Sequence, residues 1–371
     1  MVVGGSALED LGVTMRVLVT GHRGYLGGVL VPHLRAAGHD VVGLDSGLFD
    51  ACTFIAPPDV PALDLDIRDV EPEHFVGVDA VVHLAGISND PLGDLDADVT
   101  FDINHRGAAR VARAAKAAGV TRFVQSSSCS LYGSAGEELL DESADFNPVT
   151  PYGVSKVLAE DAIRALADDD FHPTFLRNGT AYGVAPHLRI DLVVNNLTAF
   201  AVATGEVLLK SNGLALRPLV HVDDISRAFL TVLEAPLDAV SGEAFNVGKT
   251  TENYRIRDVA TIVEAAVPGS RVRFADEAGP DIRNYRVNCD KLAEAVPAYD
   301  PSWTVAAGVE ELAAAYTAAG LMLDDVVGPR YLRIRYVERL IDRGLLAPDL
   351  RWRSTVSAPS LARPTLTGGV R

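Results

Sequence analysis

The first apolar segment of the chain, residues 15–20 (MRVLVT), is short and rich in β-branched residues. A glycine-rich segment follows it at 21–27, and residues 28–37 then have helical spacing. A second apolar run, 41–44, ends in Asp45. A strand, a glycine turn, a helix and a second strand in this order predict the first βαβ unit of a parallel sheet.

The alternation of strands and helices continues along the chain. Residues 80–84 and 122–126 are apolar runs of strand length, and residues 99–118 between them are predicted to form a helix. Strands and helices alternating at this spacing are typical of a parallel sheet covered on both faces. We therefore predict an α/β fold, a doubly wound parallel Rossmann sheet with a smaller α+β substrate-binding domain.

The length of 371 residues exceeds one ordinary domain and is short for three. We expect the second domain to be interleaved with the first along the chain. The predicted parts are a flexible N-terminal extension at 1–14, a dinucleotide-binding domain at 15–177 to which 219–249 return, a substrate-binding domain at 178–218 and 250–353, and a flexible tail at 354–371.

Composition and charge exclude several classes of protein. The formal net charge of −17 would repel a phosphate backbone, so nucleic acid is not expected as a partner. No apolar run reaches the roughly 18 to 20 residues of a membrane span, and the first residues lack the basic start of a signal peptide, so we predict a cytoplasmic protein without a membrane partner. Cys52, Cys129 and Cys289 lie far apart, so neither a disulfide framework nor a metal site is predicted.

The glycine turn predicts a dinucleotide site. Glycines let the backbone turn tightly and approach a pyrophosphate, and the following helix start offers unpaired N–H groups. Asp45 lies 18 residues after Gly27, at the end of the second strand, where a carboxylate can accept hydrogen bonds from the adenosine ribose.

A tyrosine and a lysine, Tyr152 and Lys156, are spaced to share one face of a helix that opens after Pro151. To act as a base near neutral pH, a tyrosine must lower its pKa by roughly 3 from about 10, which corresponds to about 4 kcal/mol. A lysine ammonium one turn away, together with a positively charged nicotinamide, can provide this stabilisation. Ser128, which closes a predicted strand, would hydrogen-bond the substrate oxygen.

Five ordered motifs carry a family resemblance: TGHRGYLG at 20–27, DLDIRD at 64–69, HLAG at 83–86, SSSCSLYG at 126–133 and YGVSK at 152–156. Together they resemble the extended short-chain dehydrogenase/reductase family, in its NAD-dependent nucleotide-sugar epimerase/dehydratase branch. The resemblance runs from about residue 15 to residue 315.

The resemblance implies a set of cofactor contacts and a nucleotide-sugar substrate. Asp45 favours NAD, since a carboxylate repels a 2′-phosphate, although Arg23 in the glycine turn keeps NADP as a less favoured alternative. Besides Tyr152 and Lys156, the implied cofactor-binding residues are Gly21, Gly24, Tyr25, Leu26 and Gly27 at the pyrophosphate, Asp45 at the ribose, Asp66 and Ile67 at the adenine, Leu84, Ala85 and Gly86 along the middle of the cofactor, and Asn104 as a support.

The second half of the chain is similar to the family's sugar-nucleotide domain. The segments that carry this similarity are 191–197, 216–224 and 279–283. The planar guanidinium of an arginine can donate two hydrogen bonds to the oxygens of a diphosphate. The resemblance implies this role for Arg217 and Arg283. The implied substrate-binding residues are Ser88, Ser130, Asn196, Arg217 and Arg283.

The run after Ser128 bears on the reaction. Dehydratases of the resembled family have an Asp-Glu pair there, whereas this chain has Cys129 and Ser130. The resemblance therefore implies an epimerase, most simply one that inverts C4 through a transient keto-sugar. Alternatives are a keto-reductase, an atypical dehydratase or other ring-carbon epimerase that uses Cys129 as a tentative catalytic group, and a non-catalytic NAD-binding protein. Cys129 is otherwise a small buried residue.

Two further expectations concern the periphery. Residues 329–343 place arginines among apolar residues and predict a helix that packs on the body and exposes its charges, with a nucleotide-facing role for one of these arginines as the alternative. By resemblance, the helices expected at 99–118 and 152–167 would form the interface of a homodimer.

Overall fold

The computed structural model describes residues 14–88, 96–279 and 283–353. The predicted C-terminal tail and the N-terminal extension up to residue 13 lie outside the described residues. Residues 280–282 of the late arginine segment also lie outside them.

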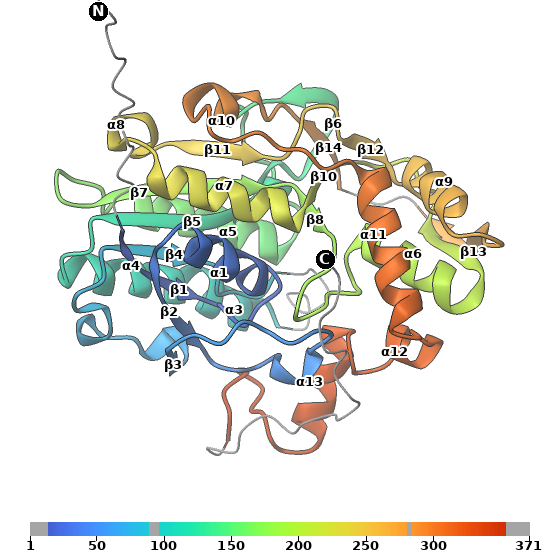
Figure 1. Ribbon diagram of the computed structural model, residues 1–371, viewed down its shortest axis with the longest axis horizontal. Helices are drawn as coiled ribbons and strands as arrows, with labels where there is room; N and C mark the ends of the chain where they lie inside the picture. Colours follow the sequence, from blue (N-terminus) through green and yellow to red (C-terminus); the bar gives the residue numbers. More distant parts are fainter. Residues whose placement is uncertain (1–13, 89–95, 280–282, 354–371) are drawn as a thin grey trace, which may run out of the picture.

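The central element is a seven-stranded parallel sheet in the order β11-β7-β5-β4-β1-β2-β3 (Figure 1). Chain order and spatial order reverse next to β1, as expected for two βαβ halves wound in opposite directions. This arrangement confirms the predicted doubly wound parallel sheet. Its strands are β1 (Arg16–Thr20), β2 (Asp40–Asp45), β3 (Ala62–Asp64), β4 (Ala80–His83), β5 (Arg122–Ser128), β7 (His172–Asn178) and β11 (Ala244–Val247).

Helices cover both faces of the sheet because apolar side chains alternate along the strands. Val17 and Val19 of β1 belong to the apolar cluster formed with α1 (Gly27–Ala36) and α7 (Val222–Glu234). Leu18 belongs to the cluster on the other face, formed with α4 (Ala108–Ala117) and α5 (Pro151–Arg164). Every strand residue of β4 is buried, as a strand covered on both faces requires.

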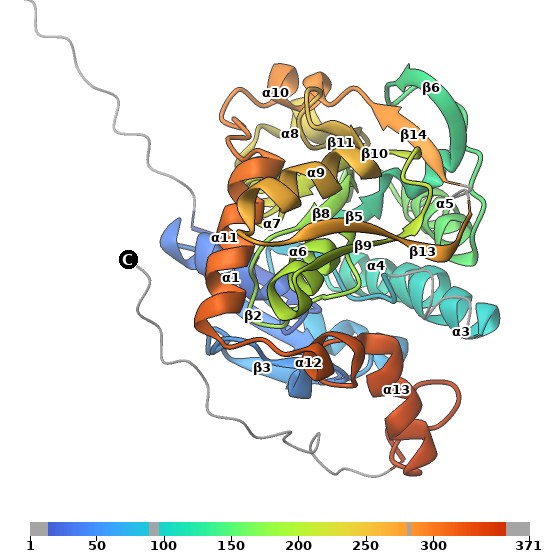
Figure 2. The ribbon, with the colours of Figure 1, turned by 90° about the vertical axis from the view of Figure 1, so that its right-hand side faces the viewer.

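The second half of the chain builds a smaller mixed region beside the carboxyl ends of these strands (Figure 2). Its apolar cluster joins helices α6, α9 and α11 to the β9/β13 pair. The bounds are α6 (Val193–Thr204), α9 (Ile256–Ala266), α11 (Val305–Ala318) and α12 (Leu323–Val327), with β8 (Thr180–Tyr182), β9 (Glu206–Ser211), β10 (Leu216–His221), β12 (Asn253–Arg255) and β13 (Arg271–Gly279).

The helix predicted at 99–118 is a composite. It consists of α3 (Ala97–Phe101), a π-helical segment (Asp102–Gly107) and α4. π-Helical insertions occur frequently at functional sites. This insertion contains Asn104, one of the predicted cofactor-site residues.

The C-terminal part of the described chain packs against the domain that contains the parallel sheet. Helix α13 (Arg333–Asp342) packs with the loop after β2 in a separate apolar cluster. The remaining elements are α8 (Leu237–Val240), α10 (Asp290–Ala295), β6 (Ser134–Leu140) and β14 (Asn284–Val287).

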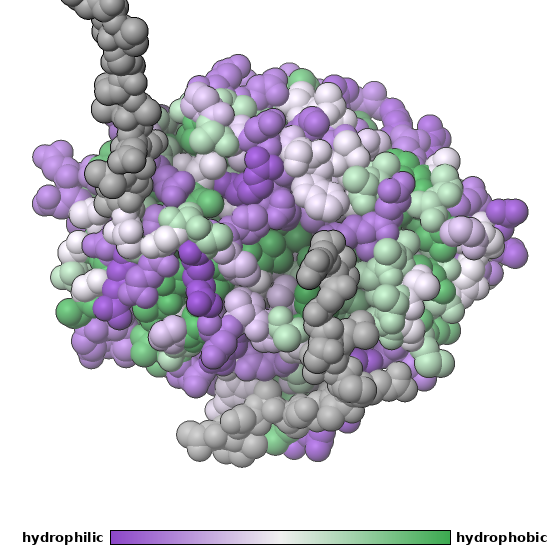
Figure 3. All heavy atoms as spheres, viewed as in Figure 1, coloured by the Kyte–Doolittle hydropathy of each residue, from purple (hydrophilic) through white to green (hydrophobic). Residues whose placement is uncertain are grey.

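Hydrophilic and hydrophobic side chains are interspersed on the face drawn in Figure 3. Within the described part of the chain, no helix combines the length and apolar character needed to cross a membrane.

Candidate active site

A cavity of about 820 Å³ lies at the carboxyl ends of the sheet strands and extends toward the second region. Residues from both halves of the chain line it. In doubly wound sheets, ligands bind at this edge. Nearly all the residues proposed from the sequence line this cavity.

The glycine turn forms one end of the cavity. Gly21 has a φ of 73°, and its N–H donates to the carbonyl of Leu44 at 2.8 Å. A Cβ at Gly21 would lie 2.8 Å from the backbone nitrogen of Ala85, and one at Gly27 would lie 2.4 Å from the Gly21 carbonyl oxygen. Only glycine fits these positions, because the turn packs directly against neighbouring backbone. Gly21, Gly24 and Gly27 also line the cavity, at a helix start of the kind that binds a pyrophosphate.

Asp45 lines the same end. It accepts hydrogen bonds from the N–H groups of Gly47 at 2.9 Å and Arg23 at 3.1 Å, and burial raises its pKa. The Arg23 guanidinium is turned to two other carboxylates, Asp50 at 3.3 Å and Asp64 at 2.6 Å. Because these ion pairs hold Arg23, its arrangement gives no support to binding of a 2′-phosphate.

Asp66 and Ile67, which the resemblance assigns to the adenine, both line the cavity. The Asp66 carboxylate pairs with Arg68 at 2.7 Å and also accepts from the Arg68 backbone N–H at 2.9 Å. Asp66 is therefore held in place by its neighbour. Tyr25, Leu26, Leu84, Ala85 and Gly86 line the cavity as predicted.

Asn104 supports the site from behind the lining. Its Oδ1 accepts from the Ile87 N–H at 2.7 Å, and its Nδ2 donates to the Ile87 carbonyl at 2.8 Å and to Ser155 Oγ at 3.1 Å. The π-helical insertion thus joins the loop after β4 to helix α5. Asn104 is buried and does not appear in the cavity wall.

Three predicted catalytic side chains meet at the junction of β5 and α5. Thr150 caps α5 by accepting from the Gly153 N–H, so the helix begins at Pro151 and brings Tyr152 into the cavity wall. The Lys156 Nζ lies 5.7 Å from the centre of the Tyr152 ring and donates to the carbonyl of Ser126 at 2.9 Å. Ser128, at the end of β5, lines the cavity and accepts from the N–H of Ser130 at 3.1 Å.

The electrostatics of Lys156 suit its proposed role. Burial lowers the pKa of this lysine from 10.5 to about 8, while the Glu160 carboxylate one turn farther along α5 opposes the shift. Lys156 therefore carries a positive charge at neutral pH in a region with little water. A charge in such a place acts on a neighbouring phenol more strongly than an exposed charge would.

A buried ion pair beneath this junction was not predicted from the sequence. Arg177 of β7 holds Glu160 through two hydrogen bonds of 2.9 and 3.1 Å, and Ser127 Oγ donates to Glu160 at 2.5 Å. The pair joins α5 to β7 and β5. One available signal was the position of Glu160, four residues after Lys156 on the buried side of α5.

Cys129 lies away from the cavity. Its side chain is fully buried, and its Sγ lies 3.0 Å from the carbonyl oxygen of Arg177. Burial raises the pKa of this thiol well above its ordinary value. Cys129 is absent from the cavity wall, whereas Ser128 and Ser130 on either side belong to it. The structure therefore does not bring Cys129 together with Tyr152 and Lys156.

All five predicted substrate-binding residues line the cavity. Arg217 is buried, donates to the Leu216 carbonyl at 2.8 Å and to that of Arg283, and lies 5.5 Å from the centre of the Tyr285 ring. Asn196 in α6 donates to the Ile190 carbonyl at 2.9 Å. Ser130 Oγ is buried without a hydrogen-bond partner among the described residues.

Arg68 and Arg189 line the cavity although neither was predicted as a site residue, and Arg333 lines it as the alternative for residues 329–343 allowed. Arg189 is buried, pairs with Asp191 at 2.5 Å and donates to Ser88 Oγ at 2.8 Å. Burial alone would lower the pKa of Arg189, but the adjacent Asp191 carboxylate raises it. The segment containing Asp191 had been singled out, but nothing in its spacing indicated that Arg189 turns inward.

The described residues contain no group of three or more His, Cys, Asp or Glu side chains arranged to hold a metal ion. The cavity fits a dinucleotide, because its wall combines three glycines of the turn with Asp45 at the end of β2. Gly21, Gly24 and Gly27 would hold the pyrophosphate and Asp45 the ribose.

Comparison with known proteins defines the family. A model of the NAD dependent epimerase/dehydratase family matches residues 17–248. Because this match covers more than half of the chain, the protein belongs to that family. The family is NAD-dependent, which confirms the predicted cofactor.

Individual relatives include enzymes of both kinds. The UDP-glucose 4-epimerase of Mycolicibacterium smegmatis is 30% identical over 317 residues, covering 80% of this chain and 96% of the relative. The structure of MoeE5 in complex with UDP-glucuronic acid and NAD is similar with a TM-score of 0.72 at 25% identity, covering 82% of this chain and 99% of that chain. DesIV, a dTDP-glucose 4,6-dehydratase from Streptomyces venezuelae, has a TM-score of 0.72 at 25% identity, covering 83% and 99%.

Proposed function

We propose that this protein is a nucleotide-sugar epimerase that inverts C4 through a transient keto-sugar. The observation that carries the proposal is the junction of β5 and α5. Tyr152, Lys156 and Ser128 meet there, while the thiol of Cys129 is turned away from the cavity.

Each of the three side chains has a distinct role. Tyr152 removes the proton of the sugar hydroxyl and returns it to the oxygen after inversion. Lys156 lowers the pKa of Tyr152 through its positive charge. Ser128 hydrogen-bonds the reacting oxygen and orients it. NAD, when bound, supplies the reversible acceptance of a hydride at the sugar carbon.

Elimination of water requires a second acid or base near the sugar, and the cavity offers little for this purpose. Among the residues that the structure describes around the cavity, the carboxylates are Asp45, Asp66 and Asp191. Asp45 and Asp66 are assigned to the adenosine in this proposal, Asp66 is paired with Arg68, and Asp191 is paired with Arg189. This arrangement favours an epimerase over a dehydratase.

The substrate end of the cavity supports a nucleoside diphosphate sugar. Arg217 and Arg283 would pair with the diphosphate, and Asn196 would donate to it. The relatives whose names include UDP-glucose 4-epimerase and the structure holding UDP-glucuronic acid agree with this class of substrate.

The proposal is tested with a panel of UDP-, dTDP-, GDP- and CDP-sugars incubated with the purified protein in deuterium oxide and followed by NMR. We expect one or more 4-epimers to form without deuterium at a ring carbon. A 4-keto-6-deoxy product would contradict the proposal and indicate a dehydratase. Deuterium at a ring carbon would indicate a different carbon of inversion, and net consumption of added NADH would indicate a keto-reductase.

We further propose a cytoplasmic homodimer that associates through α5 and the composite helix α3 to α4. Light scattering at micromolar concentration should give twice the mass of the chain. A monomer would contradict this part of the proposal.

A further inference from the structure

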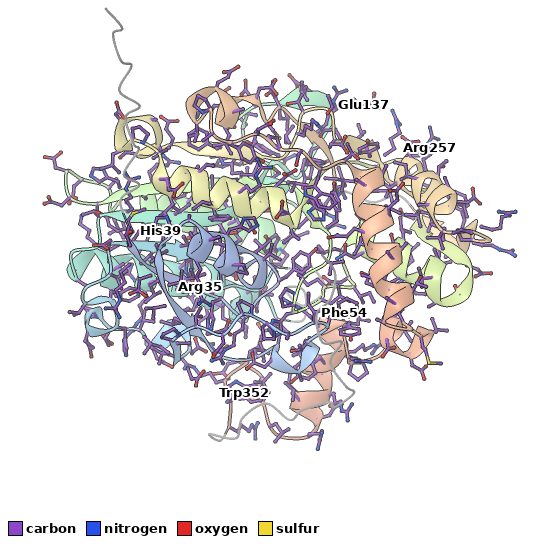
Figure 4. The ribbon with its side chains drawn as sticks, in the orientation of Figure 1. Arg35, His39, Phe54, Glu137, Arg257 and Trp352 are labelled. Carbon is purple, nitrogen blue, oxygen red and sulfur yellow. The ribbon has the colours of Figure 1, made fainter. Side chains whose placement is uncertain are left out.

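The C-terminal segment covers one side of the cavity beyond the part that the family model matches. That match ends at residue 248. Helix α13 packs its Tyr336, Val337 and Leu340 with Cys52 and Ile87 of the NAD-binding half. Trp352, which lies beside α13 at the lower edge in Figure 4, donates from Nε1 to the carbonyl of Ser46 at 2.8 Å. The segment is therefore fastened next to the end of β2.

A hydrogen bond and an ion pair hold the same segment at a second place. Arg68 donates to the carbonyl of Asp349 at 2.8 Å, and Arg351 pairs with Asp69 at 2.5 Å. Arg68 is also the partner of Asp66 at the adenine end of the cavity. Hydrogen bonds and ion pairs thus connect the C-terminal segment to Asp66, the residue assigned to the adenine.

Arg333, the first residue of α13, points inward from this segment. It is 6% exposed, lines the cavity, and its guanidinium lies 4.3 Å from the centre of the Phe49 ring. Its Nε and Nη2 are buried and have no hydrogen-bond partner among the described residues. By contrast, Arg335 has a side chain that is 62% exposed and pairs with Glu338 at 3.0 Å.

An unpaired buried guanidinium is costly, because its charge has lost water without gaining an anion. Burial and the neighbouring guanidinium of Arg189 lower the pKa of Arg333 to about 10, so the group still carries its charge at neutral pH. The nearby carboxylates are already engaged, since Asp191 pairs with Arg189 and Asp45 accepts two backbone N–H groups. Arg333 therefore keeps buried donors at Nε and Nη2 from which an anionic ligand could accept hydrogen bonds.

We propose that Arg333 binds the diphosphate of the dinucleotide, so that α13 forms part of the cofactor site. The charged groups that act on Arg333 include Asp45, which is proposed for the ribose, and Arg189, which also lines the cavity. The glycine turn provides backbone N–H groups but no cationic side chain that faces the cavity, because Arg23 is turned to Asp50 and Asp64. A guanidinium supplies the missing charge together with a forked pair of donors.

The other diphosphate in the proposed reaction belongs to the substrate. Arg217 and Arg283 line the part of the cavity formed by the second region, next to Tyr285, and are assigned to it. The inference rests on the NAD cavity of the proposed function and assigns Arg333 to the cofactor alone. Its test therefore compares NAD with UDP as separate probes.

The test uses the full chain with Arg333→Met and, as a matched control on the same helix, Arg335→Met. Three quantities are measured: the NAD retained through purification, the NAD affinity by calorimetry, and the melting temperature with and without NAD. We expect Arg333→Met to bind NAD about 10- to 100-fold more weakly and to retain less of it. Without nucleotide it should melt no lower than the parent, because the substitution removes an unpaired buried charge.

The control and the second probe separate the alternatives. Arg335→Met should keep its NAD affinity within about twofold of the parent, and UDP affinity should be unchanged in Arg333→Met. An unchanged NAD affinity with a lower melting temperature would show that Arg333 only supports the fold, and a selective loss of UDP binding would assign it to the substrate. Either result would overturn the inference.

A lysine variant covers the case in which Arg333→Met does not fold. Arg333→Lys keeps the charge but loses the planar fork, so NAD affinity should fall by about 3- to 10-fold. Parental affinity in this variant would contradict the proposed forked contact. All of these measurements report binding or melting, so they hold whether or not the enzyme proves to be an epimerase.

Discussion

Lys156 and Arg333 are two cations in the wall of one cavity, and each is 6% exposed. Their surroundings differ. Lys156 donates to the Ser126 carbonyl at 2.9 Å and has the Glu160 carboxylate nearby. Arg333 has an aromatic ring beneath its guanidinium and no hydrogen-bond partner for Nε or Nη2 among the described residues.

The difference shows which part of the site the protein completes by itself. At the junction of β5 and α5, the protein supplies both the charge and its compensation, so the acid/base group is organised before a ligand arrives. At α13 the protein supplies a charge whose compensation has to come from a ligand. Substitutions at the two ends should therefore affect turnover and binding separately.

The largest expected effect comes from Tyr152→Phe. Removing the phenol eliminates the proposed proton acceptor, so the rate of epimerisation should fall about a thousandfold or more. The NAD content of the purified protein should stay close to that of the parent. Tyr254→Phe is a matched control outside the cavity and should retain its activity. A Tyr152→Phe variant with more than about a tenth of the parental rate would exclude the proposed role.

The sequence allowed the positions of Tyr152 and Lys156 in the cavity wall to be predicted because its signals there are local. A strand, a glycine turn and a helix are consecutive in the chain, and Tyr152 and Lys156 lie one helical turn apart. Such spacing determines position before any tertiary contact is known. The parallel sheet was predictable for the same reason.

The α13 end was less predictable because its contacts join distant segments. Arg333 contacts Phe49, although the two residues lie near opposite ends of the sequence. The expectation for residues 329–343 was a helix with exposed charges. That expectation is correct for Arg335, whereas Arg333 is buried and lines the cavity, as the alternative for one of these arginines allowed. Helical spacing alone could not show which arginine faces a cavity, because the helix has apolar neighbours on more than one side.

A second prediction concerns the buried ion pair of Arg177 and Glu160 beneath the junction of β5 and α5. Arg177→Met should lower the free energy of unfolding by about 3 to 5 kcal/mol, because it leaves the buried Glu160 without its guanidinium. Arg164→Met is the control, since Arg164 lies 3.9 Å from the same carboxylate but is 43% exposed. That variant should lose less than about 1 kcal/mol. Urea unfolding measures both values, and equal losses would refute the distinction.

The pH dependence of turnover sharpens the comparison at Lys156. Because burial lowers the pKa of Lys156 to about 8, this lysine should lose its charge above that pH, and turnover should fall by up to about tenfold per pH unit. The unfolded chain binds this proton up to about pH 10.5. The contribution of Lys156 to stability should therefore rise between pH 8 and 10.5, by about 3 kcal/mol at most.

Lys156→Arg provides the control for this profile. A guanidinium keeps its charge across the range, so the fall in turnover above pH 8 should disappear or shift upward in whatever activity the variant retains. Parallel pH profiles in the parent and the variant would show that another group controls the alkaline limb.

The smallest effect is expected from Cys129→Ser. The Cys129 Sγ is fully buried, lies 3.0 Å from the carbonyl oxygen of Arg177 and is absent from the cavity wall. A serine hydroxyl can donate to the same carbonyl, so the variant should keep its turnover within about threefold of the parent. Cys289→Ser, at another buried thiol, controls for any general loss of stability.

The activity of Cys129→Ser distinguishes a catalytic Cys129 from a Cys129 that is only a small buried residue. A thiol with its pKa raised by burial is a poor proton donor, and Cys129 is not part of the cavity wall. A hundredfold loss in Cys129→Ser, with Cys289→Ser unaffected, would mean that the strand end moves to expose the thiol during turnover. The junction of β5 and α5 would then be less rigid than its hydrogen bonds indicate.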